Sequence, residues 1–186
     1  MERYFKESIA LQEAVMRDEA LLEALRQSIG TVTESLRKGN KVLIAGNGGS
    51  AADAQHFSAE LVGRYMLERR AYPALALTVD TSILTAWSND YSFDTVFSRQ
   101  LEAYAKEGDV FFGISTSGNS RNLIDALKKA KGLGVKTIGL LGKGGGAMKE
   151  LCDLALVVPS YSIPRIQEVH GMLIHIICEE VERTLA

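Results

Sequence analysis

The amino-acid sequence predicts an α/β fold, a three-layer αβα sandwich on a five-stranded, mostly parallel sheet with helices ahead of it. Two observations predict this class. Short apolar runs alternate with helical stretches, and each run is flanked by turn residues. Strands alternating with helices imply right-handed crossovers, which give a parallel sheet covered on both faces. The 186 residues contain no linker, repeat or low-complexity stretch, so we expect one domain over 1–186.

The segment 1–38 precedes the first predicted strand. It is rich in Glu, Leu, Ala and Arg, and its apolar residues have helical spacing. This pattern predicts two helices or one bent helix, with a possible interruption at Gly30. Gly39 closes the segment. We expect these helices to pack on the domain or on partner subunits.

Five apolar runs predict the strands, because strands of a parallel sheet are buried on both faces. The runs are 41–46, 74–79, 109–115, 136–141 and 154–159. Helices are predicted between them, most clearly at 51–68, 94–106 and 119–132. The last helix covers 165–185, and its middle, 171–178, carries no charge. A helix that is apolar all round is buried on all sides. In so small a domain, that burial favours a homo-oligomer.

Composition excludes several classes of partner. The net charge of −2 offers no basic stripe for nucleic acid or for an anionic membrane surface. The first twenty residues carry acids throughout and form neither a signal peptide nor a membrane span. The two cysteines form no CxxC pair and are expected to be reduced. We therefore expect a cytoplasmic protein.

Two loops follow predicted strands at the edge where open parallel sheets bind ligands. They are GNGGS (46–50) and STSGNS (115–120), and each leads into a helix whose N-terminus favours an anion. The second loop adds four hydroxyl groups that suit phosphate oxygens, from Ser115, Thr116, Ser117 and Ser120. Such residues also cap helices at ordinary strand-to-helix turns. Four hydroxyls in six residues favour a phosphate site.

The first loop also fits the dinucleotide pattern G-x-G-x-x-A, through Gly46, Gly48 and Ala51. In that scheme Asp80 would be the acid that binds the ribose. However, Asp80 comes about ten residues late against the usual spacing of about 20. The hydroxyl-rich second loop would also have no role. We therefore do not favour a dehydrogenase.

The helix after the first loop contains His56 and Glu60, four residues apart and hence on one helical face. An imidazole and a carboxylate so placed can share a metal or act as an acid/base pair. An ordinary polar contact is the alternative, but the nearby ligand loop favours function. In the final helix, geometry does not choose between His170 and His175 as a partner for Gln167. About 12 Å of helix rise separates Gln167 from His175.

The runs 46–65, 89–90, 109–120 and 165–176 together resemble the sugar isomerase (SIS) fold, and more specifically the phosphoheptose isomerases. The resemblance covers essentially the whole chain. It implies interconversion of sedoheptulose 7-phosphate and D-glycero-D-manno-heptose 7-phosphate, the first step toward activated heptose for lipopolysaccharide core or other surface glycans. It also implies a homotetramer with active sites between subunits.

The resemblance further implies roles for individual residues. The hydroxyls of the second loop hold the phosphate, and Glu60 and His175 match the proposed acid/base pair. His170 has no catalytic role by this matching. The residues matched to the sugar are Asn47, Gly48, Gly49, Glu60, Asn89, Asp90 and Gln167. The residues matched to one zinc ion per subunit are His56, Glu60, Gln167 and His175.

The implied chemistry suits these residue types. Moving a carbonyl between C1 and C2 requires proton transfers through an enediol(ate), which a carboxylate and an imidazole can carry out. One carboxylate cannot easily be both a tight zinc ligand and a free base, so the two roles of Glu60 are in tension. The alternative is a non-catalytic SIS module that engages a partner protein, such as a replication initiator, and has lost the acid. Because Glu60 and His175 are both present, we favour the enzyme.

Overall fold

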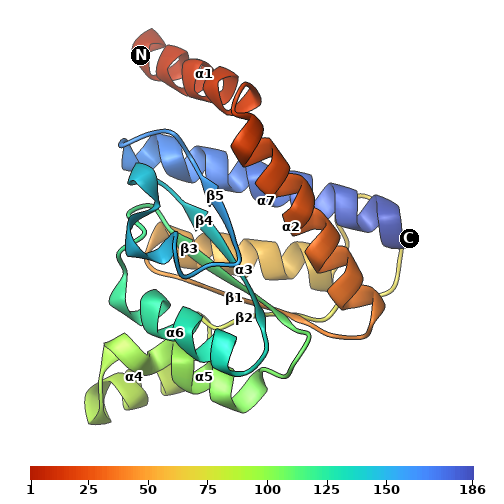
Figure 1. The fold of residues 1–186 in the computed structure, drawn as a ribbon, viewed down its shortest axis with the longest axis vertical. Helices are drawn as coiled ribbons and strands as arrows, with labels where there is room; N and C mark the ends of the chain where they lie inside the picture. Colours follow the sequence, from red (N-terminus) through yellow and green to blue (C-terminus); the bar gives the residue numbers. More distant parts are fainter.

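A parallel sheet in the order β2-β1-β3-β4-β5 forms the centre of the molecule in a computed structural model that describes residues 1–186 (Figure 1). Every neighbouring pair of strands is parallel. The predicted fold class is therefore confirmed. The strands are β1 (Val42–Gly46), β2 (Ala74–Ala76), β3 (Val110–Ser115), β4 (Lys136–Leu141) and β5 (Leu154–Val157).

Helices cover both faces of this sheet (Figure 1). One face carries α2 (Glu19–Arg37), α3 (Gly49–Val62) and α7 (Ile163–Leu185). The other face carries α5 (Val96–Tyr104) and α6 (Arg121–Gly132), and α4 (Thr81–Asp90) lies beside α5. The first helix, α1 (Glu2–Met16), extends away from the sheet. Two 3-10 segments complete the chain, Phe93–Thr95 and Lys143–Met148.

Alternate side chains of the buried strands feed two separate apolar cores. In β1, Val42 and Ile44 join the core beneath α2, α3 and α7, whereas Leu43 and Ala45 join the core beneath α5 and α6. This alternation is the two-residue period of a strand. Both sets are fully buried, which explains why the sequence shows continuous apolar runs rather than alternation.

The interruption predicted at Gly30 is wrong, because Gly30 lies inside α2. The chain breaks instead between α1 and α2, where Asp18 is the N-cap and its side chain accepts a hydrogen bond from the Leu21 amide at 3.0 Å. The predicted end of the segment at Gly39 is confirmed, with a positive φ of 78°. Only Leu11 and Val15 of α1 are buried.

One predicted helix also needs correction. The helix predicted over 51–68 begins at Gly49 and ends at Val62, so residues 63–73 form a long connection to β2. The pair Asn89–Asp90 lies within the last turn of α4.

The topology brings two loops together at one edge of the sheet. From β1 the chain crosses to β2 on one side, and from β3 it crosses to β4 on the other. The two connections leave a crevice between the carboxyl ends of β1 and β3, where open α/β sheets bind ligands. The glycine loop (46–50) and the hydroxyl loop (115–120) are the segments that follow these two strands.

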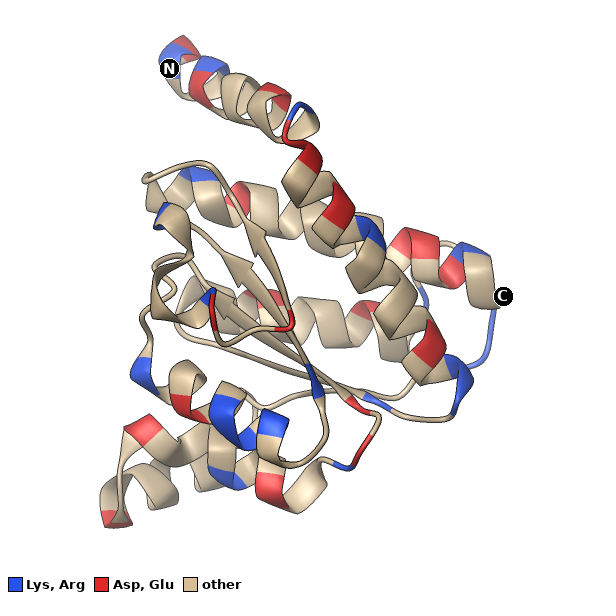
Figure 2. Cartoon of the chain, viewed as in Figure 1, with Lys and Arg blue, Asp and Glu red and all other residues tan.

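Charges of both signs are mixed along the elements (Figure 2). Many are paired along a single helix, as in the Arg3–Glu7 pair of α1 and the Arg26–Glu23 pair of α2. None of the helices combines the length and the apolar character that crossing a membrane requires.

Candidate active site

The glycine loop places the N-terminus of α3 directly against α7. Gly48 is the N-cap of α3 and has a positive φ of 56°. At Gly49, a Cβ would collide with the side-chain amide nitrogen of Gln167. The structure therefore brings three predicted sugar-binding residues, Gly48, Gly49 and Gln167, to one place.

The fourth residue of this group, Asn47, has a partner that the sequence did not reveal. Its amide and the Asn122 amide exchange two hydrogen bonds, of 3.0 and 2.9 Å. Asn122 is buried in the first turn of α6, so this pair ties the glycine loop to the helix that follows the hydroxyl loop. The only sequence signal for a role of Asn122 is that it follows the predicted site residue Ser120 by two positions.

The hydroxyl loop gathers its serines around one point at the start of α6. The Ser115 hydroxyl lies 3.1 Å from the Ser120 hydroxyl and 3.4 Å from that of Ser117. Ser120 is the N-cap of α6, yet its hydroxyl makes no capping bond. Helix capping therefore does not explain this serine, whose hydroxyl contacts that of Ser115 at the positive end of the helix, where an anion is favoured.

The glycine-rich segment after β4, Lys143–Met148, packs against the hydroxyl loop. The amide of Ala147 donates to the Asn119 side-chain oxygen at 3.0 Å, and the amide of Met148 donates to the Gly118 carbonyl at 2.9 Å. The contact is so close that a Cβ on Gly118 would collide with the carbonyl of Gly145. The hydroxyl loop is thus hydrogen-bonded to, and closely packed against, the neighbouring backbone.

The second group of predicted residues lies farther along α3 and α7, which run side by side (Figure 1). His56 Nε2 is 2.9 Å from His175 Nε2 and 3.5 Å from Glu60 Oε1. The two imidazole rings meet edge to face, with centroids 5.1 Å apart. The His56 side chain is 49% exposed and the Glu60 side chain 22%. Two distant helices therefore bring Glu60 and His175 to the same imidazole nitrogen.

Two further side chains border this group. Asp53 lies one turn before His56 on α3, and burial raises the pKa of its carboxyl while His56 opposes the shift. The buried Oδ2 atom of Asp53 has no hydrogen-bond partner within the chain. On the other side, the Tyr65 ring lies 5.8 Å from the His175 ring. Neither residue followed from the sequence motifs.

The sequence left open whether His170 or His175 faces the site, and the two histidines of α7 differ in burial. His170 is fully buried, and its Nε2 atom donates to the Leu141 carbonyl at 3.1 Å. Burial lowers the pKa of His170 to about 4, although that hydrogen bond opposes the shift. His175, within the uncharged stretch, is exposed in this chain. Gln167 stays beside Gly49, and since α7 is continuous it lies about 12 Å along the helix from His175.

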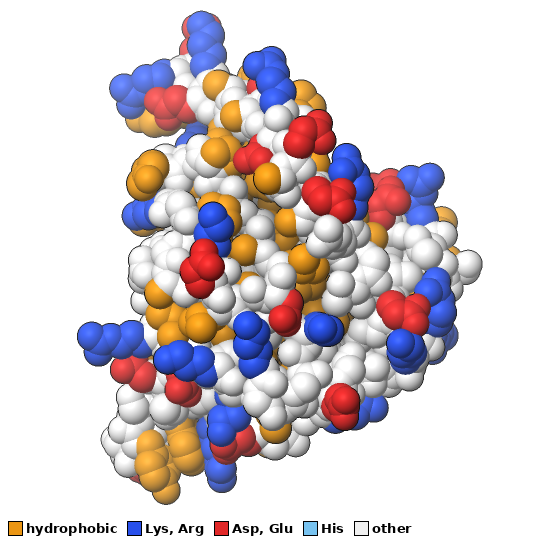
Figure 3. Space-filling model, in the orientation of Figure 1, with side chains coloured by type: hydrophobic (Ala, Val, Ile, Leu, Met, Phe, Trp, Pro, Cys, Tyr) orange, Lys and Arg blue, Asp and Glu red, His pale blue; other side chains and the backbone are white.

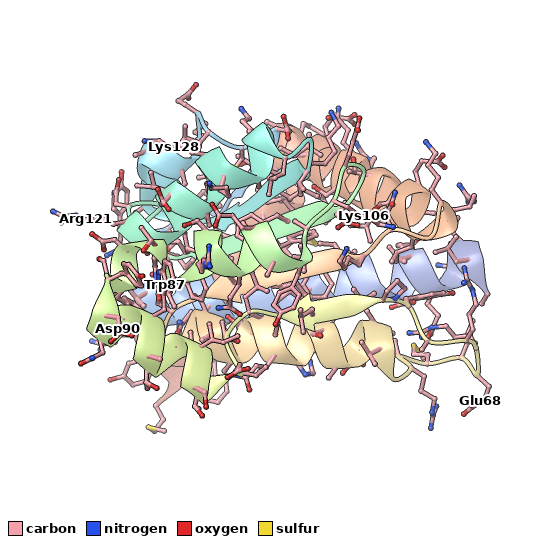
Figure 4. The ribbon with its side chains drawn as sticks, turned by 90° about the horizontal axis from the view of Figure 1, so that it is seen from below. Glu68, Trp87, Asp90, Lys106, Arg121 and Lys128 are labelled. Carbon is pink, nitrogen blue, oxygen red and sulfur yellow. The ribbon has the colours of Figure 1, made fainter.

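The predicted pair Asn89–Asp90 stands apart from both groups. The Asn89 amide donates to the Asp90 carboxylate at 2.9 Å, and neither side chain bonds another predicted site residue. Figure 4 places Asp90 toward the same end of the molecule as Arg121, the first residue of α6, and away from Glu68 in the loop after α3. The pair thus lies toward the end where the hydroxyl loop enters α6.

The donor atoms around His56 have the right chemistry for zinc, which takes imidazole and carboxylate ligands. With zinc–nitrogen bonds of about 2.0–2.1 Å, tetrahedral geometry would set two imidazole nitrogens about 3.3 Å apart. The 2.9 Å separation of His56 and His175 would need to widen by a few tenths of an ångström. As the side chains stand, no three His, Cys, Asp or Glu residues are arranged as a metal centre. Gln167 does not lie with the other three predicted ligands.

This chain therefore carries two groups of predicted residues. One lies at the carboxyl edge of the sheet and contains the glycine loop, the hydroxyl loop and Gln167; the other contains His56, Glu60 and His175. They are separated by about seven residues of α3, or about 10 Å of helix. The largest hollow, about 670 Å³, lies elsewhere, between α2 and the amino ends of β3, β4 and β5, and contains no predicted site residue.

Comparison with known families defines the class to which this fold and these loops belong. The family model for the SIS domain matches residues 3–142. That range includes both ligand loops and the His56–Glu60 pair. The molecule is thus an SIS-domain protein.

Individual relatives narrow the class. The chain is 56% identical over 182 residues to a phosphoheptose isomerase of Aliarcobacter butzleri, covering 97% of this chain and 96% of the relative. Over 185 residues it is 51% identical to a phosphoheptose isomerase of Clostridium acetobutylicum, covering 100% of this chain and 94% of the relative. The solved phosphoheptose isomerase of Neisseria gonorrhoeae superposes with a TM-score of 0.92 at 43% identity, covering 98% of this chain and 96% of that one. The chain belongs to the phosphoheptose isomerase family, as its motifs predicted.

Proposed function

We propose that this protein interconverts sedoheptulose 7-phosphate and D-glycero-D-manno-heptose 7-phosphate. One observation carries the proposal: Glu60 and His175, from two separate helices, both reach His56 Nε2. The membership of the chain in a family of isomerases supports the same conclusion. The reaction is an aldose–ketose isomerisation in which a proton leaves one carbon and returns to its neighbour.

The hydroxyl loop would hold the phosphate. The hydroxyls of Ser117 and Ser120 lie 3.4 and 3.1 Å from that of Ser115, at the N-terminus of α6. Backbone N–H groups and the positive helix end add favourable electrostatics without a cationic side chain. Thr116 lies within this loop. The phosphate would fix the sugar near Asn47, Gly48 and Gly49, and Asn89 and Asp90 would line its far side.

The proton transfers fall to Glu60 and His175. We assign the carbon-bound proton to the Glu60 carboxylate, which removes it from one carbon of the ketose and returns it to the neighbouring carbon of the aldose. His175 moves the proton between the two hydroxyl oxygens. The carbonyl thereby shifts from C2 to C1 through an enediol(ate), with no net change in atoms or charge.

We also propose one zinc ion, held by His56, Glu60 and His175 with Gln167 as the fourth ligand. The set of imidazole, carboxylate and amide donors supports this proposal. A bound zinc ion would polarise the sugar carbonyl and stabilise the developing oxyanion. The proton-transfer role of Glu60 requires that its carboxylate be free while the proton moves.

The two separated groups of residues support an assembly in which different copies complete one site. Gln167 lies about 12 Å along α7 from His175, and one metal cannot contact both residues of the same helix without long displacements. Exposed apolar side chains on α1 offer a surface for assembly, namely Tyr4, Phe5, Ile9 and Met16. Figure 3 shows apolar side chains along this helix. We propose a cytoplasmic homotetramer with active sites between subunits.

A non-catalytic SIS module is the alternative function, and the site does not favour it. Such a module would have lost the carboxylate that follows His56 by four residues. Here Glu60 is present and lies 3.5 Å from His56 Nε2. No surface of the molecule gives a specific reason to prefer a protein partner such as a replication initiator.

The direct test incubates the purified protein with sedoheptulose 7-phosphate, with and without added zinc, and follows the sugar signals by ¹³C NMR. The proposal predicts a new aldose signal, formed faster when zinc is present. No aldose under either condition, from protein that unfolds cooperatively, would refute the proposed activity. Formation at equal rates with and without zinc after exhaustive chelation would refute the metal.

A further inference from the structure

The connection between α3 and β2 is anchored by a buried ion pair that no part of the proposed mechanism uses. Arg69 and Glu182 lie 2.9 Å apart, with side chains only 3% and 2% exposed. Arg69 belongs to the loop after α3, whereas Glu182 lies near the end of α7. A buried ion pair contributes little net stability by itself, because desolvating both charges offsets their attraction. Its value lies in the geometry that it imposes.

Glu182 organises the loop that carries Tyr65. Its carboxylate accepts hydrogen bonds from the backbone amides of Tyr65, Met66 and Leu67, at 3.0, 2.7 and 2.8 Å. Burial alone would raise the pKa of this carboxyl, but these donors and Arg69 outweigh burial and hold the pKa below its usual range. The loop is therefore fixed to α7, and the Tyr65 ring is held beside His175.

Arg69 closes the end of α3. One terminal nitrogen of its guanidinium donates to the carbonyl of Glu60 at 2.8 Å, and the other donates to the carbonyls of Leu61 and Gly63. The carbonyls of Glu60 and Leu61 are among the last four of the helix, which have no partner within it, and Gly63 is the C-cap. The Tyr72 ring packs against the guanidinium at 4.1 Å and is itself buried. Arg69 thus holds the backbone of the very residue assigned as the base.

The Arg69–Glu182 ion pair is connected to both helices that carry the proton-transfer residues Glu60 and His175. On α3 the anchor is Glu60 itself, and on α7 Glu182 follows His175 by seven residues, which is two turns on the same face. Apolar side chains of α3 and α7, among them Phe57, Leu61 and Ile174, pack together in the buried core and hold the two helices side by side. The ion pair adds a buried polar connection at the C-terminal end of α3, where Arg69 also bonds the Glu60 carbonyl.

We propose that Arg69 and Glu182 are positioning residues that set the spacing of Glu60 and His56 against His175. This inference rests on the proposed function for its effect on turnover. Arg69 is specific in this place, because a lysine is a point charge that cannot bond the carboxylate and the helix carbonyls together. Neither residue touches the substrate in this scheme.

The chain offers a matched control at the opposite edge of the sheet. Asp109 is a fully buried carboxylate that accepts the backbone amides of Lys41 and Lys106 and pairs with the Lys41 ammonium. Like Glu182, it joins a loop to a neighbouring element through amides and one cation. It precedes β3, at the amino end of the strands, away from the proposed site.

The experiment compares Glu182→Gln and Arg69→Lys with Asp109→Asn in the full-length, zinc-loaded protein, well below the unfolding midpoint. We expect kcat for sedoheptulose 7-phosphate to fall at least tenfold in the two anchor variants, with KM within about twofold of wild type. Asp109→Asn should lower the unfolding midpoint and leave kcat unchanged. If Glu182→Gln no longer unfolds cooperatively, kcat and KM of Arg69→Lys test the same expectation. Equal kcat losses in all three variants would overturn the proposal.

A second measurement, of the histidine side chains by NMR, does not depend on the proposed activity. The chain has three histidines, so a long-range ¹H–¹⁵N spectrum of the substrate-free, metal-free protein resolves their imidazoles. The signals of His56 and His175 should shift in the anchor variants, while His170 serves as the internal reference. Unchanged imidazole signals in Glu182→Gln and Arg69→Lys would refute positioning, even for a protein with no isomerase activity.

Discussion

The buried His170 should make the stability of this protein depend on pH in mildly acidic solution. Its Nε2 atom donates to the Leu141 carbonyl, so the neutral ring keeps its lone pair on Nδ1. That Nδ1 atom is buried and has no partner. Protonating it would place an unpaired charge in the core, and burial accordingly lowers the pKa of His170 to about 4 from an ordinary value of 6.5. The folded state therefore resists a proton that the unfolded state accepts.

The sign and size of the effect follow from that difference. Above pH 6.5 the imidazole is neutral in both states and contributes nothing. Below 6.5 the unfolded chain binds the proton first, so the free energy of unfolding falls with decreasing pH until about pH 4. From pH 7.5 to pH 5.0 the loss is about 2 kcal/mol, and the full shift corresponds to about 3 kcal/mol.

The assay is urea unfolding of wild type and His170→Gln at pH 7.5 and pH 5.0, at one protein concentration and with chelator present. Glutamine keeps a donor for the Leu141 carbonyl but does not titrate. We expect the wild type to lose about 2 kcal/mol more than His170→Gln between the two pH values. If both proteins lose the same stability, the reasoning about His170 is refuted.

Three further predictions test the loops. Ser117→Ala and Ser120→Ala should each raise KM several-fold with little change in kcat, because donors to a non-reacting phosphate contribute uniform binding; steady-state kinetics would contradict this if kcat fell at constant KM. Gly118→Ala should destabilise the protein by more than about 2 kcal/mol, because its φ of +64° and the nearby Gly145 carbonyl leave no room for a Cβ; an unchanged thermal midpoint would contradict it. Asn122→Ala should raise KM, because it removes the two hydrogen bonds that hold the Asn47 side chain. An unchanged KM would contradict a role of the Asn47–Asn122 pair in substrate binding.

Local patterns predicted most of the fold and the main site groups. The apolar runs located all five strands, because the three central strands are buried on both faces and the two edge strands are partly buried. The four-residue spacing of His56 and Glu60 placed them on one face of a helix, and they are in contact. The hydroxyl content of residues 115–120 indicated a cluster that the structure contains.

Features set by distant residues could not be predicted. Helix α3 ends at Val62 because Arg69 takes its last carbonyls, and Arg69 is held by Glu182, 113 residues away. An arginine in a charged run gives no sign that it will be buried. His170 and His175 share an apolar helix, and only the packing of α7 on β4 buries one and exposes the other. Gly30 suggested a break because glycine is a poor helix former, but packing of α2 overrides that preference.

The central claim is that the Glu60 carboxylate, beside His175, transfers the proton during isomerisation. It is tested most directly by measuring turnover of sedoheptulose 7-phosphate and affinity for inorganic phosphate in the same preparation of Glu60→Gln. We predict that turnover falls by at least about a hundredfold, the typical share of a general base, while phosphate affinity and the unfolding midpoint stay at wild-type values. Turnover by Glu60→Gln at the wild-type rate would contradict the claim.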